Sequence, residues 1–295
     1  MITEVVVTMF GITALGMLIN RLAGRTPLYS SAVELLVDFV YWILIPLTFF
    51  KTFSERGLEL SDVWILTSFL VFMVITFTAL YRARRYEERG VREAVFLSSA
   101  FPNAVFLGFP VSMAFFNTLE VASVFGLFTV TLNVVIPDLM TARRNAVVKL
   151  LRHPALIGFI AGVLLHSTSP EYVTAVSECL SWVTPLLSYS STLVLGLRLP
   201  LSLNPVKKYL RVTAVVALFR FAVHPLVSLL VMQLFNVPWV KGAQLMLLSA
   251  MPPALVNTII SERYDWKPEL VSTTTVTLTM FSLIALTVLS CLVRG

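Results

Sequence analysis

The sequence predicts an all-α polytopic membrane protein of ten transmembrane helices, arranged as two inverted five-helix repeats in which helices four and nine are broken crossover helices. Of the 295 residues, 57% are hydrophobic and 13% are charged, and the mean hydropathy is +0.87; an ordinary soluble domain has roughly a quarter charged residues. Apolar runs recur along the whole chain. The segment Leu97–Ala104 also recurs at Leu247–Ala254, with five identical positions and a proline in both copies.

Ten apolar runs have the composition of membrane helices and are separated by short basic or Pro/Gly-containing breaks. The sixth is shorter than the ~20 residues that a perpendicular helix needs. The first has neither a basic segment before it nor a small-residue cleavage site, so we expect a retained helix and not a signal peptide. The expected helices are residues 5–19, 33–53, 63–81, 94–116, 120–140, 154–166, 173–197, 212–235, 242–261 and 271–292.

Basic residues alternate with this topology. Of the 22 Lys and Arg residues, 17 lie in loops after odd-numbered helices, four lie on the opposite side, and Arg220 alone lies inside an expected helix. Because basic loops stay in the cytoplasm, we expect both termini outside it, Arg84 and Arg144 inside it, and the protein in the cell membrane. Nucleic acid is not an expected partner, since it needs basic residues gathered on one folded surface.

Each half of the chain contains five expected helices. Because five is odd, the second half (147–295) must enter the membrane in the opposite orientation to the first half (1–146), which is an inverted repeat. Spaced glycines, which permit close helix approach, occur in the first and sixth helices at Gly11, Gly16, Gly158 and Gly162.

Prolines interrupt the fourth and ninth helices at equivalent repeat positions. Pro102 and Pro110 lie in the fourth helix, and Pro252 and Pro253 lie in the ninth. Proline removes a backbone donor and clashes with the carbonyl four residues before it, so each helix should break and leave unpaired backbone groups. Within a membrane such groups must be buried in protein or face a cavity, which makes the breaks a candidate site. The alternative is that the prolines only kink the helices.

Three segments resemble the auxin efflux carrier family. Pro102–Pro110 is similar to the fourth-helix motif of that family, and Pro252–Pro268 with Val271–Thr275 is similar to its ninth helix and the start of its tenth. Arg220 and Pro225 also fit the family pattern in the eighth helix. The similarity covers essentially the whole chain and fits the compact prokaryotic form, which lacks a long loop between helices five and six.

The resemblance implies a fold shared with bile-acid:sodium symporters. Helices 1, 2, 6 and 7 would form a scaffold domain, and helices 3–5 with 8–10 would form a transport domain in which broken helices four and nine cross. Members of the family carry auxin-like compounds or small carboxylates such as malate and malonate, and they suggest a homodimer formed through the scaffold. These properties are implied by the resemblance.

The candidate substrate-binding residues surround the two breaks and are Ser99, Pro102, Asn103, Asn133, Ser249, Pro252, Pro253 and Asn257. Asn103 follows the first break, where its amide can donate to a carboxylate; the alternative is that it only satisfies broken backbone. The same alternative applies to Asn257, and packing is the alternative for Asn133. Ser99 and Ser249 can instead bond to their own backbone. Positive helix N-termini at the crossover would add about 0.3–1 kcal/mol of attraction for an anion.

A second group of candidates consists of ionisable residues inside the expected helices. Arg220 cannot be neutralised, so it must pair, face water or extend to the membrane surface. We expect an acidic partner, Asp138 in preference to Asp38. His224 lies four residues after Arg220 on the same helix face, where it could couple transport to protons or form an ordinary hydrogen bond.

The leading interpretation is a carrier that moves a small organic carboxylate anion across the lipid bilayer by alternating access. A ligand-sensing membrane receptor on the same fold and a sodium-coupled organic anion symporter remain alternatives. The absence of Asp and Glu from expected helices four, nine and ten argues against sodium, although threonine hydroxyls and carbonyls there could supply ligands. No enzyme motif is present. We expect no metal site and no cofactor, since Cys179 and Cys291 lack metal or redox spacing.

Overall fold

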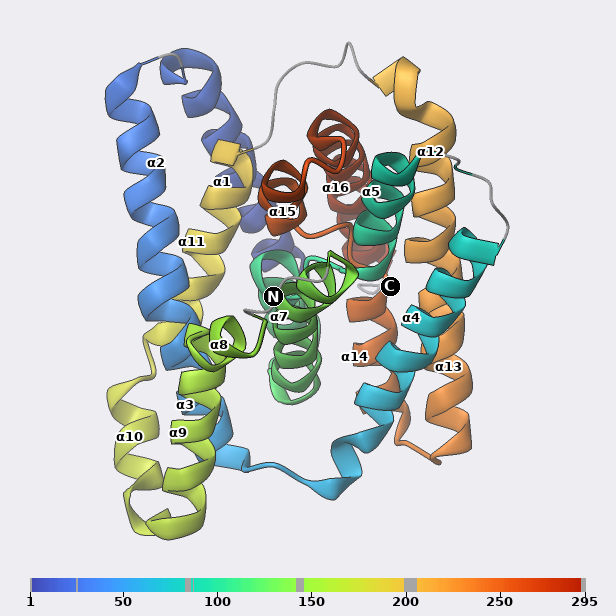
Figure 1. Cartoon of the computed structure of the whole chain (residues 1–295). Coiled ribbons are helices and arrows are strands. Elements are labelled where there is room, and N and C mark those ends of the chain that lie inside the picture. The colour runs from blue at the N-terminus through green and yellow to red at the C-terminus, as the bar shows by residue number, and fades with distance from the viewer. Residues whose placement is uncertain are drawn as a thin grey trace.

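The computed structural model describes residues 2–24, 26–82, 86, 88–141, 146–198 and 206–292. Every regular element in these ranges is helical (Figure 1). Arg84 and Arg144, which we expect in the cytoplasm, lie outside the described residues.

The first half of the chain contains seven α-helices, joined or interrupted by shorter helical turns. In order, the elements are α1 (Ile2–Ala23), α2 (Pro27–Phe39), the π-helical turn η1 (Val40–Leu44), α3 (Ile45–Arg56), the 3-10 turn η2 (Leu60–Asp62), α4 (Val63–Arg82), α5 (Arg89–Ala100), the π-helical turn η3 (Ala104–Gly108), α6 (Phe109–Phe116) and α7 (Glu120–Met140).

The second half begins with a short helix that has no counterpart among the expected elements. In order, its elements are α8 (Ala146–Leu151), α9 (Pro154–Thr168), the 3-10 turn η4 (Pro170–Tyr172), α10 (Val173–Cys179), α11 (Val183–Arg198), α12 (Val206–Leu218), the π-helical turn η5 (Phe219–Val223), α13 (His224–Leu234), α14 (Trp239–Ser249), α15 (Val256–Tyr264) and α16 (Pro268–Leu292).

Six helical segments within the described residues are long and apolar enough to cross a membrane. A seventh is formed if α10 and α11, which meet at an angle of 41°, count as one broken span. The residues 104–116 and α9 form shorter apolar helices. The protein is therefore an all-helical membrane protein. The six segments are Glu4–Ala23, Pro27–Arg56, Leu60–Arg82, Glu120–Met140, Val206–Leu234 and Pro268–Leu292.

Each of the three π-helical turns ends just before a proline. Pro46, Pro110 and Pro225 are the second residues of α3, α6 and α13. Proline leaves the carbonyl four residues earlier without its usual donor, and the helix adapts by bonding across five residues, as the amide of Ile45 does to the carbonyl of Val40. The expected interruption at Pro110 is therefore wrong, because the helix absorbs this proline as a π-turn and continues.

Two pairs of helices approach closely at glycines. On α9, a side chain at Gly158 would place its Cβ 2.1 Å from the carbonyl oxygen of Pro46 on α3. On α1, a Cβ at Gly16 would lie 2.8 Å from the carbonyl oxygen of Leu193 on α11. The structure thus confirms the predicted close approach at these glycines. Gly11 instead faces open space, with no described atom within 4 Å of the position that a Cβ would take.

The helices form two lateral groups with a third group between them (Figure 1). One lateral group contains α1, α2, α3, α9, α10 and α11, and the other contains α4, α12 and α13. Helices α5, α7, α14, α15 and α16 lie between the two groups. Both broken helices therefore lie in the interior of the bundle.

Candidate substrate-binding site

The two broken helices meet at their breaks. α5 ends at Ala100 and α14 ends at Ser249, and each is followed by a short non-helical stretch. The amide of Asn103 donates to the carbonyl of Pro252 at 2.7 Å, and the amide of Ala254 donates to the carbonyl of Phe101 at 3.0 Å. These bonds form an antiparallel bridge between the two segments. The helix breaks expected at Pro102 and Pro252 are confirmed, and part of the freed backbone is satisfied by the opposite break.

Arg220 binds the carboxyl ends of both helices that precede the breaks. Its Nε donates to the carbonyl of Met251 at 2.9 Å, and its Nη1 donates to the carbonyl of Ser99 at 3.2 Å. Its Nη2 donates to the carbonyl of Ser249. Ser99 and Ser249 occupy equivalent positions in the repeated segment, so one guanidinium joins the two copies. A cation at the carboxyl end of a helix is also favoured by the helix dipole.

The serine side chains contribute less than their backbones. The hydroxyl of Ser249 donates to the carbonyl of Met246 at 2.7 Å, which is the self-bonding alternative for this residue. The hydroxyl of Ser99 is buried and has no partner among the described residues. Both serines therefore act in this structure through the carbonyl groups that Arg220 binds.

His224 supports Arg220 from within the same helix. Its Nδ1 lies 3.0 Å from Nη1 of Arg220, and its ring stacks on Phe72 with the centroids 3.9 Å apart. Because guanidinium can only donate, Nδ1 must accept, so the imidazole is neutral and carries its proton on Nε2. Of the two alternatives for His224, the structure therefore shows the ordinary hydrogen bond of a neutral imidazole.

The expected pairing of Arg220 with an acidic residue is wrong. Asp138 is completely buried and binds Lys149 of α8 and the hydroxyl of Tyr264 of α15. Asp38 lies on α2, in the other lateral group from the turn that carries Arg220, and is exposed. The guanidinium of Arg220 instead donates its hydrogen bonds to backbone carbonyls. These carbonyls are acceptors, as carboxylates are, but they carry no net charge.

Asn257 satisfies backbone that the first break leaves unpaired. Its Nδ2 donates to the carbonyls of Leu97 and Phe101, at 3.2 Å and 3.1 Å. Since Nδ2 is the donor, its Oδ1 must accept, and it does so from Nδ2 of Asn133 at 3.1 Å. This fixes the orientation of Asn133, whose own Oδ1 is buried and has no partner among the described residues. In this structure Asn257 therefore hydrogen-bonds the backbone that the break leaves unpaired, which is the alternative to a role in substrate binding.

A cavity of about 100 Å³ opens beside the breaks, room for several water molecules on the measure of about 10–15 Å³ each. Its walls are mostly apolar. Asn103 lines it, is only 2% exposed, and has a buried Nδ2 with no partner in the described part of the chain. Of the other predicted residues, Pro102 and Asn133 also line it, and Ser99, Ser249, Pro252, Pro253 and Asn257 do not. The lining residues are Tyr41, Ile45, Pro102, Asn103, Ala104, Val105, Phe106, Thr129, Val130, Asn133, Val134, His153, Ala254, Leu255, Val256 and Ile260.

The amino ends of three helices reach the cavity wall. Asn103 caps the helix that runs through η3 and α6, Leu255 caps α15, and His153 caps α9. All three residues line the cavity. Each amino end carries the equivalent of about half a positive charge, so their sum favours a negatively charged occupant.

Among the lining residues that sequence reasoning missed, two carry aromatic rings with polar groups. Tyr41 lies in the π-turn before Pro46, and His153 directly precedes Pro154 of α9. Nothing in the sequence connects them with Asn103, since they come from different helices. The proline after each marks a local change in helix geometry, which is the one signal that could have drawn attention to them.

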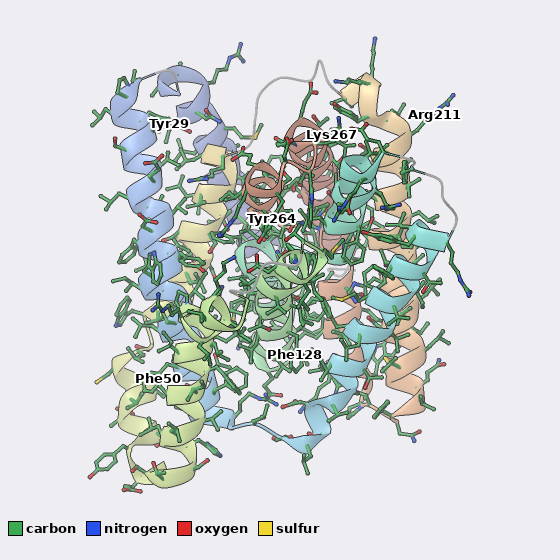
Figure 2. The ribbon with its side chains drawn as sticks, viewed as in Figure 1. Tyr29, Phe50, Phe128, Arg211, Tyr264 and Lys267 are labelled. Carbon is green, nitrogen blue, oxygen red and sulfur yellow. The ribbon has the colours of Figure 1, made fainter. Side chains whose placement is uncertain are left out.

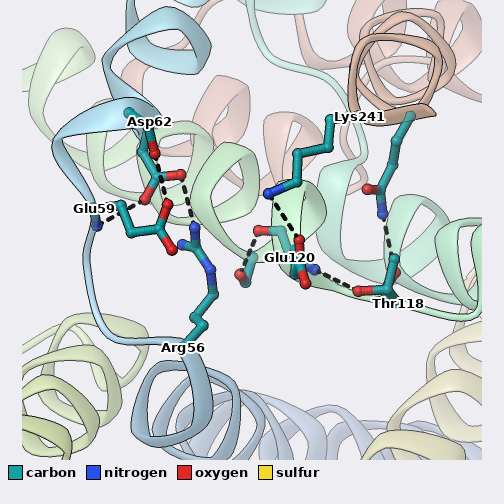
Figure 3. Close-up of polar contacts among 9 residues, drawn as sticks. Arg56, Glu59, Asp62, Thr118, Glu120 and Lys241 are labelled. Carbon is teal, nitrogen blue, oxygen red and sulfur yellow. Dashed lines mark hydrogen bonds and ion pairs between the residues drawn. The ribbon is translucent and has the colours of Figure 1, made fainter. Parts of the chain in front are cut away.

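A second polar region lies around the loop that joins α3 to α4 (Figure 3). There Arg56 binds Asp62 at 2.7 Å, and Lys241 binds Glu120 at 3.2 Å. The nearby cavity of about 260 Å³ is lined by all four of these residues. The four charged side chains that line this cavity, two of each sign, pair with one another, so its lining offers no excess charge of either sign.

Comparison with known proteins places the chain among membrane transport proteins. The model of the family Mem_trans, described as membrane transport protein, matches residues 138–290, which is just over half of the chain. A protein of Rhizobium meliloti (strain 1021) named "Putative malonate transporter" is 24% identical over 318 aligned residues, which cover 100% of this chain and 96% of that protein.

Proposed function

We propose that this chain, which belongs to the Mem_trans (auxin efflux carrier) family of membrane transport proteins, moves a small organic carboxylate anion across the membrane by alternating access. Membership of this family makes the chain a transporter and not an enzyme. The anion would bind in the cavity beside the two helix breaks.

The observation that carries the proposal is the unpartnered side-chain amide of Asn103. A buried donor without an acceptor costs about 1–3 kcal/mol, and native structures avoid this cost unless a ligand, ion or water supplies the acceptor. Asn103 is 2% exposed and lines the cavity. A carboxylate oxygen of a bound anion would supply the missing acceptor.

The charges around the cavity support an anion over a cation. Three helix amino ends reach its wall, and no acidic side chain lines it among the described residues. The buried guanidinium of Arg220 binds carbonyls of both interrupted helices and has no carboxylate partner in the described residues. In surroundings of low dielectric, these positive groups would attract an anion more strongly than they would in water.

We further propose ten membrane spans in two inverted repeats, residues 1–146 and 147–295. In this arrangement α1, α2–α3, α9 and α10–α11 form the scaffold, and the remaining spans form the transport domain. The helix packing supports the repeat. The first span of each half packs on the second span of the other half: α1 packs on α11, and α9 packs on α3. The cavity has walls from both domains, with Tyr41 from the scaffold and Asn103 from the transport domain, so relative movement would open it alternately to each side.

The orientation with both termini outside the cytoplasm, location in the cell membrane and a homodimer formed through the scaffold are parts of the same proposal. Arg211 and Lys267, from two loops expected in the cytoplasm, lie at the same end of the molecule (Figure 2). This arrangement supports one basic, cytoplasmic end. Cysteines introduced at the two positions should resist membrane-impermeant reagents in intact cells, and labelling from outside would contradict the orientation.

The experiment that tests the proposed function is uptake by purified protein in proteoliposomes. The name of the Rhizobium meliloti relative makes malonate the first probe. Labelled malonate should exchange across the membrane, and empty liposomes should not take it up. Binding without exchange would favour the receptor alternative, and exchange that depends on a sodium gradient would favour the sodium-coupled alternative.

A further inference from the structure

The side chain of His153, which lines the cavity, is a neutral imidazole whose tautomer is set by one hydrogen bond. It caps α9 and is 6% exposed, and its Nδ1 accepts a hydrogen bond from the amide of Ala155 at 3.3 Å. An Nδ1 that accepts cannot carry a proton, so the proton of this neutral imidazole is on Nε2. No described residue accepts a hydrogen bond from Nε2.

The imidazole lines the same cavity as Asn103 but comes from a different group of helices. Its ring packs edge-on against Tyr41 of η1, with the centroids 5.5 Å apart. Both residues belong to the lateral group that contains α2, α3 and α9, whereas Asn103 follows α5 in the interior of the bundle. All three line the same cavity. Two residues whose side-chain donors, Nδ2 of Asn103 and Nε2 of His153, have no acceptor among the described residues thus line one small cavity from different helix groups.

The segment that carries His153 is held in place by a partly buried ion pair. Lys149 of α8 binds the completely buried carboxylate of Asp138 on α7, and Tyr264 of α15 donates to the same carboxylate. α8 ends at Leu151, two residues before His153. The ion pair therefore restrains the chain immediately before the imidazole, which reduces the entropy lost when a ligand binds.

We propose that His153 is a second substrate contact and that it selects dicarboxylates: one carboxylate of a small diacid accepts from Asn103, and the other accepts from Nε2 of His153. This inference rests on the function proposed above and names the substrate class of that site. A monocarboxylate of the same length would leave one of the two donors without an acceptor. Sites that hydrogen-bond a substrate group discriminate strongly against analogues that lack it, because the buried donor then stays unpaired.

The test compares malonate with propionate, which has the same number of carbon atoms and one carboxylate fewer. Calorimetry on the purified full chain measures the two dissociation constants for wild type and for His153→Asn. Asparagine is a favoured helix cap, so it can keep the bond to the amide of Ala155 while removing the Nε2 donor. His166→Asn is the matched control, because His166 lies on the same helix but bonds to the carbonyl of Ser54 and does not line the cavity.

Wild type should bind malonate at least tenfold more tightly than propionate. His153→Asn should weaken malonate binding about 10- to 100-fold, the range for losing a hydrogen bond to a charged group, and change propionate binding less than twofold. His166→Asn should keep the wild-type ratio. If His153→Asn weakens both anions equally, or neither, the inference is overturned while the anion site stands. If wild type binds no carboxylate, the proposed function fails as well.

A second measurement needs no variant. Diethyl pyrocarbonate modifies accessible histidine nitrogens, and mass spectrometry resolves the peptides that contain His153 and His166. Malonate should protect His153 and leave His166 unchanged, and propionate should protect His153 less. A His153 that is modified equally with and without malonate would overturn the inference.

Discussion

The backbone amide of Asn103 donates a 2.7 Å hydrogen bond to the carbonyl oxygen of Pro252, which joins the two broken helices at their breaks. A second backbone bond, from Ala254 to Phe101, completes the bridge. Backbone groups exposed at one break are therefore satisfied by the other. Because its main chain is already bonded, Asn103 keeps its side-chain amide available to a ligand.

Replacing Arg220 by methionine should destabilise the protein by about 3 kcal/mol or more, because buried carbonyls at the ends of α5 and α14 lose their donor. Arg220→Lys should cost less than Arg220→Met, since it keeps the charge but not the planar set of donors. Melting temperatures of the detergent-solubilised variants measure both effects. Arg211→Met, on α12 at a position away from the breaks, is the control. A methionine variant at position 220 that melts like wild type would contradict this role.

Two double-mutant cycles distinguish the partner of Asp138. Asp138→Ala and Lys149→Ala should couple by about 0.5–3 kcal/mol, because the two side chains form an ion pair. Asp138→Ala and Arg220→Ala share no partner and should be additive within about 0.5 kcal/mol. Denaturation of the purified variants gives the four free energies for each cycle. Coupling in the second cycle and additivity in the first would mean that the pairing is assigned to the wrong residues.

Adding one methyl group at Gly158 should loosen the packing of α9 on α3. The new Cβ would lie 2.1 Å from the carbonyl oxygen of Pro46, so the helices must move apart, at a cost of about 1–3 kcal/mol. Gly11→Ala is the matched control, because no described atom lies within 4 Å of the Cβ position there and alanine favours a helix over glycine by about 1 kcal/mol. Thermal unfolding compares the two. Equal stability of both variants would refute the close contact.

Acidification should destabilise the protein through His153. This residue precedes α9, and burial lowers the pKa of its imidazole to about 4, below the value of about 6.5 for an exposed histidine. Between these values the unfolded chain binds more protons than the folded chain. The contribution of His153 to stability is therefore complete above about pH 6.5 and is lost as the pH falls toward 4.

Melting temperatures from about pH 7 to about pH 5 test this dependence. Wild type should lose a few degrees more than His153→Asn over this range, because asparagine does not titrate. Other groups titrate in both proteins and cancel in the comparison. Identical losses would show that His153 does not contribute to the acid sensitivity.

The features predicted correctly from the sequence depend on residues close together in the chain. The breaks at Pro102 and Pro252 follow from the missing amide of proline, and the close approach at Gly158 follows from the absent side chain. The same reasoning wrongly predicted a break at Pro110. A helix can accommodate the hydrogen bond lost at a proline by adding one residue to a turn, and this occurs before Pro110. A π-turn and a break have the same sequence signal.

The partner of Arg220 and the position of His153 could not be predicted in this way. Depth in the membrane suggested Asp138 as the counter-charge, but the guanidinium binds carbonyls of helix ends that lie 29 and 121 residues away in the chain. Main-chain acceptors occur at every residue, so composition gives no sign of which are free. His153 reaches the cavity only through the packing of α9 on α3, a tertiary relationship.

The central claim, that the amide of Asn103 binds a carboxylate, is tested most directly by malonate binding to Asn103→Ala. Loss of a hydrogen bond to a charged group should weaken binding by about 1–3 kcal/mol, with an unchanged melting temperature in the absence of ligand. Thr129→Val is the matched control, because Thr129 lines the same cavity but its hydroxyl is already bonded to the carbonyl of Phe125. The account predicts weakened binding and uptake for Asn103→Ala and wild-type values for Thr129→Val. Wild-type affinity and uptake in a well-folded Asn103→Ala would contradict it.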